Sequence, residues 1–341
     1  MKSNNSRSRA TGRVTLADVA ALAKVSPITV SRALRGERAV ASDLTARVKA
    51  AALKLGYTPD PAARALASRH SDHVAVLIPM LSNNLFVDVL ESIQKTLRLA
   101  GYQTLIGITH YNTQEEEQLL REQLQHRPAG ILVTGLDRSD AARALIEKSG
   151  IPCVHMMELA LSPDVNSVGF SQTQAASTLT EHLLSRGRQR IAFAAAQLDP
   201  RTMQRLEGWR KTLKAAKLYE KGLSYTNKSA SSMALGGEML QHIIADDPSI
   251  DAIFFCNDDL AQGALLAAQR LKIKVPQQLA IAGFNDLTGS DLVGPGLTTI
   301  RTPRAAIGEA AAKMLLSLMR DEDVAAPSVD VGYELMVRGS T

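Results

Sequence analysis

The sequence predicts two fold classes in one chain, a small all-α head and a larger α/β core built from two doubly wound parallel-sheet lobes. Three helical segments with recognisable first or last residues follow one another between residues 14 and 56. From residue 73 onward, apolar runs alternate with helical segments, which is the pattern of parallel strands joined by crossover helices. The pattern occurs twice, so we expect two similar lobes. At 341 residues, the chain has room for both parts.

The first helix of the head is expected to begin after Thr15. Thr15 and Asp18 have the spacing of a capping box, in which a hydroxyl and an acidic side chain satisfy exposed backbone amides. Apolar residues then recur at helical spacing as far as Ala23, which gathers them on one face. That face is expected to pack against the other two helices.

Two further helices complete the head. After a tight turn, Ser26 is the expected N-cap of the second helix, with Pro27 at its first position, where a missing amide costs nothing. Apolar side chains up to Leu34 would face inward. The third helix is expected over residues 42–55, and Gly56 ends it. Three such helices form a small common core.

This arrangement is a helix-turn-helix, which lays its second helix in the major groove of DNA. Pro27, Ile28 and Arg32 are the expected base readers. Ile28 suits a thymine methyl group, whereas Arg32 can bind guanine or hold a phosphate. Four hydroxyl side chains are expected to bind phosphate and set the register, namely Thr15, Ser26, Thr29 and Ser31. The alternative is a three-helix packing unit without DNA contact.

Charge favours the DNA-binding interpretation. Residues 1–73 hold 13 lysines and arginines against 5 acids, a formal charge of +8, although the whole chain carries only +5. Such asymmetry is typical of proteins that bind a polyanion. Residues 1–13 are polar and basic, so we expect a disordered arm and not a signal peptide. No apolar run of about 18 residues occurs, so no membrane partner is expected and the predicted location is cytoplasmic.

The segment that joins the head and the core is a candidate conformational switch. Residues 57–61 break the helical pattern, and residues 62–68 then form a short helix-prone stretch. A helix of that length is marginal alone in water, so a contact must stabilise it. The expected domains are a disordered basic arm at 1–13, a DNA-binding domain at 14–60, a hinge helix and linker at 61–72, and a ligand-binding and dimerisation core at 73–341.

The core is expected to bind a ligand between its lobes. Its apolar runs are residues 73–79, 103–109, 129–135 and 151–157 in the first set, and 190–196, 251–257 and 278–284 in the second. Open α/β sheets bind ligands beyond the carboxyl ends of their strands, so two facing lobes predict a cleft site. The chain has no phosphate loop, nucleophile elbow or HExxH motif, and no paired carboxylates at a catalytic spacing. We therefore expect no enzyme activity, no cofactor and no metal site.

Polar side chains that follow the predicted strands are the candidate ligand contacts. They are Asn83, Phe86, Arg201, Arg205, Asn257, Asn285 and Asp286. Amide, carboxylate and guanidinium groups around an aromatic ring suit a polyhydroxylated molecule of sugar size. Asp199 is expected to orient one of the arginines.

Other chemistry-bearing residues have a structural alternative. Asp258 either contacts the ligand or only caps a helix, and Trp209 is more typical of a core than of a ligand wall. Cys153 and Cys256 lie in apolar runs, so we expect free buried thiols.

Several motifs resemble those of the LacI/GalR family of bacterial transcription regulators. They are VTLADVAALAKVSPITVSRAL, GYTPDPAARAL, FFCNDDLAQGA, LAIAGFND and LTTIRTP. The resemblance runs from Val14 to the chain end. It implies a dimeric DNA-binding protein whose hinge helix joins the head to a periplasmic-binding-protein-like core, and whose effector changes operator affinity. The segments LDPRT and PMLSNNLF are most similar to the gluconate and 2-ketogluconate repressor branch.

The resemblance also implies roles for single residues. It places Pro27, Ile28 and Arg32 at DNA-contact positions, and Leu66, with Ala63 beside it, where the family inserts a leucine into the minor groove. It places Asn83, Phe86, Arg205, Asn257 and Asn285 at positions that often line the effector pocket.

Two positions depart from the family pattern. Asp60 replaces a usual asparagine, and Asn285 replaces a frequent aspartate. A neutral Asn285 near arginine suits an acidic sugar. The chain ends without a leucine heptad tail, so a dimer and not a tetramer is expected.

The sequence thus predicts a homodimeric repressor of a sugar or sugar-acid catabolic operon, with double-stranded operator DNA and gluconate or 2-ketogluconate as its partners. Effectors release some family members from DNA and load others onto it, so the sign of the response is open. A solute-binding protein for a sugar is the alternative, but the basic arm stands where its export signal should be. A sugar-modifying enzyme would need the catalytic groups that are missing.

Overall fold

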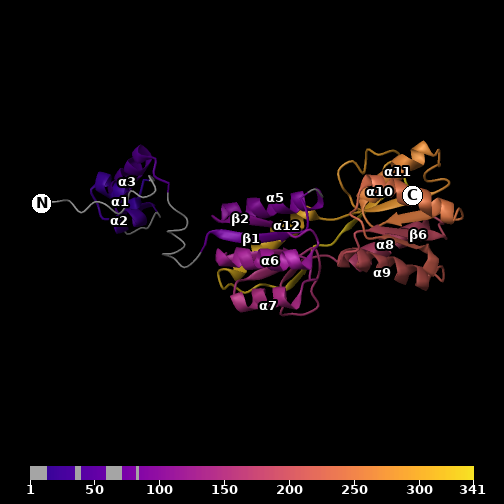
Figure 1. Ribbon diagram of the computed structural model, residues 1–341, viewed down its shortest axis with the longest axis horizontal. Coiled ribbons are helices and arrows are strands. Elements are labelled where there is room, and N and C mark those ends of the chain that lie inside the picture. Colours follow the sequence, from indigo (N-terminus) through magenta and orange to yellow (C-terminus); the bar gives the residue numbers. More distant parts are fainter. Residues whose placement is uncertain (1–13, 35–39, 59–70, 82–83) are drawn as a thin grey trace. The chain divides into compact units, whose positions relative to one another are not determined.

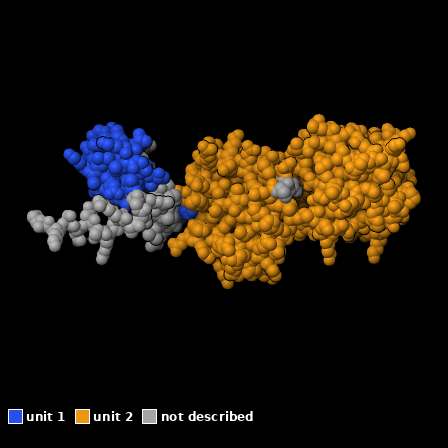
Figure 2. Space-filling model, turned by 45° about the horizontal axis from the view of Figure 1, so that its top comes forward, with its two compact units in different colours: residues 1–71 blue, residues 72–341 orange. Residues whose placement is uncertain are grey.

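The computed structural model describes residues 14–34, 40–58, 71–81 and 84–341, and it divides into two compact units, residues 1–71 and 72–341 (Figures 1 and 2). Several predicted features lie outside the described residues: the basic arm at 1–13, most of the hinge at 61–72, Asp60, Ala63, Leu66 and Asn83. The three proposed boundaries between the four domains remain predictions.

The first unit is a bundle of three helices. They are α1 (Leu16–Ala23), α2 (Pro27–Leu34) and α3 (Ser42–Leu55). The expected capping box of α1 is confirmed, because the Thr15 side chain accepts from the Asp18 amide and the Asp18 carboxylate accepts from the Thr15 amide. Val19, Val30 and Val48, one from each helix, are fully buried in one apolar cluster. Local capping and a shared core therefore hold the predicted head together.

Lobe 1 is a parallel six-stranded sheet covered by helices on both faces (Figure 1). Its strands are β1 (His73–Ile78), β2 (Gln103–Ile108), β3 (Gly130–Thr134), β4 (Cys153–Met156), β5 (Ser167–Gly169) and β11 (Ser328–Asp330). They lie in the order β11-β5-β4-β3-β1-β2. Its helices are α5 (Asn84–Leu99), α6 (Thr113–Gln125), α7 (Asp140–Ser149) and α12 (Arg304–Leu318). Alternate residues of β1 pack on opposite faces, Val76 on the α5 side and Leu77 on the α6 side.

Lobe 2 repeats this architecture in the order β12-β10-β9-β8-β6-β7. Its strands are β6 (Ile191–Ala196), β7 (Ser224–Asn227), β8 (Ala252–Phe255), β9 (Ala280–Asn285), β10 (Thr298–Arg301) and β12 (Glu334–Met336). Its helices are α8 (Gln172–Ser185), α9 (Pro200–Ala215), the short 3-10 helix η1 (Lys221–Leu223), α10 (Met233–Asp246) and α11 (Asp258–Arg270). The edge strand β12 pairs antiparallel with β10, which the sequence pattern did not predict.

All seven predicted strands are present, and the described residues contain five further strands that were not predicted. The predicted strands include β3, β6 and β9, every residue of which is buried, so they appear in the sequence as continuous apolar runs. The missed strands are β5, β7, β10, β11 and β12, which have only three or four residues each.

The chain passes between the lobes three times, as Figure 1 shows. It crosses after β5, after β10 and after β11. The carboxyl ends of β5 and β10 therefore lead directly into the other lobe. None of the described helices combines the length and the apolar content that a membrane span requires.

Candidate functional site

Helix α2 presents the predicted DNA-reading side chains on its exposed face. Pro27, Ile28 and Arg32 are exposed, and Ile28 keeps 66% of its surface accessible, whereas Val30 and Ala33 are buried. A contact with a thymine methyl group requires an exposed apolar side chain near the amino end of the recognition helix, and Ile28 lies at such a position. The assignment to DNA bases remains a prediction.

The hydroxyl groups predicted to bind phosphate also organise the head. The Thr15 hydroxyl donates to Asp18 Oδ2 at 2.7 Å, so its proton is already used within the capping box. Ser26 Oγ accepts from the Thr29 amide at 3.2 Å and lies 2.8 Å from Thr29 Oγ1, which confirms Ser26 as the cap of α2. Ser31 is half-buried on the same helix. Phosphate contacts by these four side chains remain predictions.

The interlobe site lies where the carboxyl ends of the two sheets meet. Its members from lobe 1 follow β2, β3 and β4, and those from lobe 2 follow β6 and β8 or form the end of β9. We define it by Tyr111, Asp137 and Glu158 of lobe 1 and by Arg201, Arg205, Asn257 and Asn285 of lobe 2. Direct bonds between Arg201 and the two lobe 1 carboxylates join the lobes at this point.

Arg201 is buried and paired with three carboxylates. Its Nη1 lies 3.2 Å from Glu158 Oε2 and 3.5 Å from Asp137 Oδ1 across the interface, and its Nη2 lies 3.1 Å from Asp199 Oδ1 on its own helix. Burial alone would lower the pKa of Arg201, but the carboxylates reverse this effect and raise it. Asp199 orients Arg201, as expected. Arg201 therefore already has its counterions.

Glu158 is the centre of this bridge, although its sequence context did not mark it. Its carboxylate accepts from Arg201, from Gln204 Nε2 at 2.6 Å and from the Leu136 amide at 3.2 Å. The neighbouring Gly135 has a φ of +76°, and a Cβ there would collide with Arg201 Nη1 and with both lobe 1 carboxylates. Glycine at this turn is therefore what lets the arginine reach lobe 1.

Arg205, one turn further along α9, is buried without a carboxylate. Its Nε donates to Gln172 Oε1 at 2.9 Å, its Nη1 donates to the Cys256 carbonyl at 2.6 Å, and its guanidinium lies 3.9 Å from the Phe284 ring centroid. Among the described residues, no acid lies within ion-pair distance of it. Burial lowers the pKa of Arg205, which is the cost of holding a desolvated cation. An anionic ligand would supply the missing counterion.

The two predicted asparagines each keep an amide NH2 group for a ligand. Asn257 Oδ1 caps α11 by accepting from the Leu260 amide at 3.1 Å and also accepts from Ser231. Asn285 is buried with a φ of 114°, and its Oδ1 accepts from Thr302 Oγ1 at 3.1 Å. In the described part of the chain, neither side-chain nitrogen has a hydrogen-bond partner. Both can donate to ligand oxygens.

Two other predicted contacts have structural roles in this conformation. Phe86 is only 1% exposed and lies in the apolar core of lobe 1. The Asp286 carboxylate is bound by Arg301 Nε at 2.8 Å and by Arg338 Nη2 at 2.7 Å. We therefore leave Phe86 and Asp286 out of the ligand site that we propose.

Asp258 does not cap α11, because Asn257 is the cap, and its carboxylate is bound by groups of the protein. Its buried carboxylate accepts from the Leu287 amide at 2.6 Å, Thr299 Oγ1 at 2.7 Å and Ser290 Oγ at 3.1 Å. Burial raises the pKa of Asp258 to about 6, although these three hydrogen bonds oppose the shift. The residue ties the loop after β9 to β10 and α11.

The remaining alternatives are settled by burial. Trp209 is fully buried with its ring 5.7 Å from Phe193, so it is a core residue. Cys153 and Cys256 are free thiols, as expected, but only Cys256 is buried and Cys153 is half-buried. Desolvation raises the pKa of Cys153 to about 12 and that of Cys256 to about 11. Protonated thiols of this kind are poor nucleophiles. Within the described ranges, no three His, Cys, Asp or Glu side chains are grouped to hold a metal.

Sequence reasoning missed several residues of the site that belong to strand ends it had located. Tyr111, Asp137 and Glu158 follow β2, β3 and β4, so the strand-end rule that selected Arg205 applied to them as well. Phe284 lies inside a predicted strand and was not named as a candidate.

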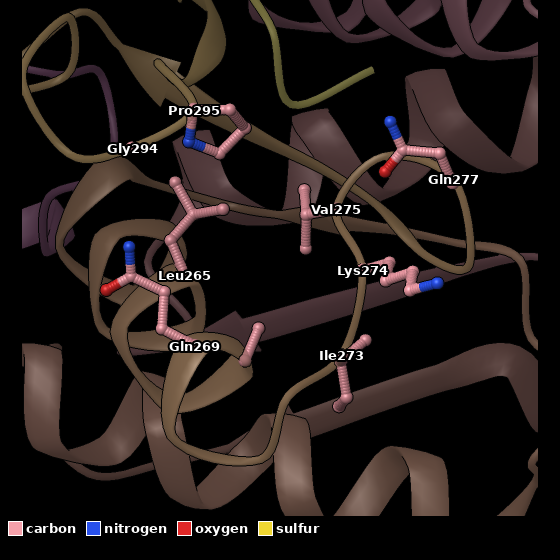
Figure 3. A pocket seen from close by; sticks show the side chains of 9 residues that line it. Leu265, Gln269, Ile273, Lys274, Val275, Gln277, Gly294 and Pro295 are labelled. Carbon is pink, nitrogen blue, oxygen red and sulfur yellow. The ribbon is translucent and has the colours of Figure 1, made fainter.

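A separate hollow of about 430 Å³ lies in lobe 2, at the end of α11 (Figure 3). Leu265, Val275 and Pro295 are among its lining residues, and the lining contains none of the interlobe residues. It offers no buried charge, so we do not assign the ligand to it.

A helix-turn-helix head joined to a two-lobed core with buried cations between its lobes defines a DNA-binding regulator that responds to a ligand. Residues 15–60 match the model for bacterial regulatory proteins of the lacI family, and residues 180–341 match the periplasmic binding protein-like domain. The chain belongs to the LacI family of bacterial regulatory proteins. The family and fold that its motifs predicted are thereby confirmed.

Individual relatives match most or nearly all of the chain. The HTH-type transcriptional regulator GntR of Pseudomonas aeruginosa is 52% identical over 99% of this chain and 98% of its own length. The crystal structure of the transcription regulator GntR from Chromobacterium violaceum is 48% identical, with a TM-score of 0.77, over 79% of this chain and 98% of that one. The lac repressor dimer bound to operator and the anti-inducer ONPF has a TM-score of 0.85 at 24% identity, over 96% of this chain and 99% of that one, and shows the shared fold. The first two relatives are named as transcriptional regulators, and the third is named as a repressor.

Proposed function

We propose that the chain is a homodimeric repressor of a sugar-acid catabolic operon, with α2 on operator DNA and gluconate or 2-ketogluconate in the interlobe site. The class of ligand is inferred from the surroundings of Arg205. A buried guanidinium held only by amide, carbonyl and ring contacts is short of one negative charge. A carboxylate can satisfy it with two parallel hydrogen bonds.

The surrounding groups suit the rest of such a ligand. The amide nitrogens of Asn257 and Asn285 can donate to hydroxyl or keto oxygens, and the Phe284 ring provides an apolar face. Arg201 is already neutralised by three carboxylates, so a second anionic group on the ligand would lack a partner. We therefore infer a ligand with a single carboxylate.

The proposed mechanism couples this site to DNA through the spacing of the lobes. A ligand shifts an equilibrium only by its differential affinity for the two conformations. Any change in lobe spacing at this edge must alter the bonds from Arg201 and Gln204 to Glu158, because they cross the interface. Coupling of this kind typically changes operator affinity by about 5- to 150-fold. A protein that acts on chromosomal DNA in this way works in the cytoplasm.

A titration of operator binding tests the proposal. The operator is first selected from genomic DNA fragments with the full-length protein. Fluorescence anisotropy then measures DNA affinity with D-gluconate, with 2-ketogluconate and with neutral D-glucose. We expect at least one acid to change the affinity about 5-fold or more and glucose to leave it unchanged. A protein that binds the acids but no DNA would support the solute-binding alternative.

The same samples test the absence of catalysis. No catalytic constellation was found in the sequence, and we propose that the acids leave the protein unchanged. Chromatography of gluconate after long incubation should recover it intact, whereas a new product would point to an enzyme.

A further inference from the structure

Tyr111 is a lobe 1 residue of the interlobe site that has no part in the ligand contacts proposed above. It follows β2, and its ring centroid lies 5.8 Å from the Arg201 guanidinium carbon of lobe 2. His110 and Tyr111 both have left-handed backbone conformations, with φ values of 48° and 57°. Two successive non-glycine residues in this region are uncommon, and such strain persists only where the surrounding structure enforces it.

The turn that carries Tyr111 is fixed on both sides. The Thr109 amide donates to the Ile78 carbonyl at 3.0 Å, and the His110 amide donates to the Pro79 carbonyl at 2.9 Å. Asn112 then caps α6 through its side chain. These bonds anchor the turn to β1 and α6, so the phenol is presented from a rigid frame.

The phenol lies among charged groups of the opposite lobe. Burial raises the pKa of Tyr111, and the charges that act on it are those of Asp199, Arg201 and Arg205. The hydroxyl therefore stays protonated at neutral pH and acts as a donor. In the part of the chain that the structure describes, this hydroxyl makes no hydrogen bond. The half-buried ring, which packs against Arg201, thus carries an unused donor within electrostatic range of Arg205, the cation that lacks a counterion.

We propose that Tyr111 is an effector-binding residue, whose hydroxyl donates a hydrogen bond from lobe 1 to the carboxylate that Arg205 binds from lobe 2. This inference rests on the proposed function, since it needs an anionic ligand at Arg205. A ligand held by both residues binds best at one lobe spacing. Tyr111 would therefore give the ligand part of its preference for one conformation.

A purely structural role for Tyr111 is the competing explanation, because the ring also packs against Arg201. Replacement by phenylalanine separates the two, since Tyr111→Phe keeps the ring and removes only the hydroxyl. Tyr225→Phe is the matched control. The Tyr225 hydroxyl bonds to Asp246 on α10, away from the interlobe site.

The experiment measures two affinities for the full-length wild type and both variants. Calorimetry gives the dissociation constants for D-gluconate and 2-ketogluconate, and anisotropy gives operator affinity without ligand. For Tyr111→Phe we expect the dissociation constant of the bound acid to rise about tenfold, with ligand-free operator affinity within twofold of wild type. Tyr225→Phe should match wild type in both.

Three results would overturn the inference. Unchanged acid binding in Tyr111→Phe would remove the hydroxyl from the site while leaving the proposed function intact. Altered operator affinity without ligand would indicate the structural role instead. If the wild type binds neither acid, the proposed function fails and the role of Tyr111 falls with it.

Discussion

Arg201 and Arg205 lie one turn apart on α9, yet only Arg201 is paired with carboxylates. Arg205 contacts an amide oxygen, a backbone carbonyl and an aromatic ring. One cation therefore joins the lobes, and the other is available to an anion. Two buried arginines can therefore be neighbours although only one of them needs the ligand as a counterion.

Replacing Arg205 by methionine should weaken binding of the acid strongly without unfolding the core. Charged hydrogen bonds are worth more than neutral ones, so we expect ligand affinity to fall on the order of 100-fold. Thermal stability should be kept, because an apolar side chain avoids the cost of burying a cation. Calorimetry and thermal unfolding check both points.

Arg210→Met on the same helix is the control, since Arg210 pairs with the surface residue Glu207. Equal acid affinity in Arg205→Met and the wild type would mean that the site lies elsewhere.

Gly135→Ala should open the interlobe bridge. Its Cβ would collide with Arg201 and the lobe 1 carboxylates, and the φ of +76° would be strained as well. Gly150→Ala is the matched control, because Gly150 has a φ of +63° but no atom within 4 Å of an added Cβ. We expect Gly135→Ala to lose about 1–3 kcal/mol more unfolding free energy than Gly150→Ala in urea. Equal losses would show that the bridge tolerates the methyl group.

Asp258 should make the core less stable as pH rises. Its folded pKa of about 6 lies above the ordinary aspartate pKa of 3.8, so the folded state holds the proton more tightly. The stability that this proton confers is full below about pH 4 and is lost as pH rises through 6, by up to about 3 kcal/mol. When urea unfolding is measured from pH 4 to 7, the free energy of unfolding of the wild type should therefore fall by that amount relative to that of Asp258→Asn.

Asp247 provides a control of opposite sign. Hydrogen bonds from Arg190 and Ser249 lower its pKa to about 2, so its contribution is present above the unfolded pKa and is lost as pH falls. A difference between wild type and Asp258→Asn that stays constant with pH would refute the assignment for Asp258.

Arg32→Ala should weaken operator binding while leaving the head folded. Loss of a guanine contact would cost about 1–3 kcal/mol and relax specificity at one base pair. Loss of a phosphate contact would instead weaken all sequences alike and reduce the salt dependence. Anisotropy at two salt concentrations on operator and mutated operators distinguishes the two. Undiminished affinity would take Arg32 off the DNA surface.

Much of the fold was predictable because its signals are local. Ser26 and Pro27 mark the start of α2 by side-chain chemistry alone, and the buried strands appear as apolar runs. The antiparallel strand β12 was missed because none of its three residues is buried and their structure depends on pairing with β10.

The site was only partly predictable because pairing depends on residues that are distant in sequence. Strand-end position identified Arg205, Asn257 and Asn285. It could not reveal that Arg338, 52 residues later, forms an ion pair with Asp286. Nor did it show that Arg201 would form an ion pair with Glu158 of the other lobe.

The most direct test is the operator affinity of wild type and Arg205→Met, each measured with increasing D-gluconate and 2-ketogluconate. We predict that both proteins bind operator equally without ligand and that an acid changes the affinity of the wild type alone. A variant that responds at the same acid concentration as the wild type would contradict the assignment of Arg205 as the anion site.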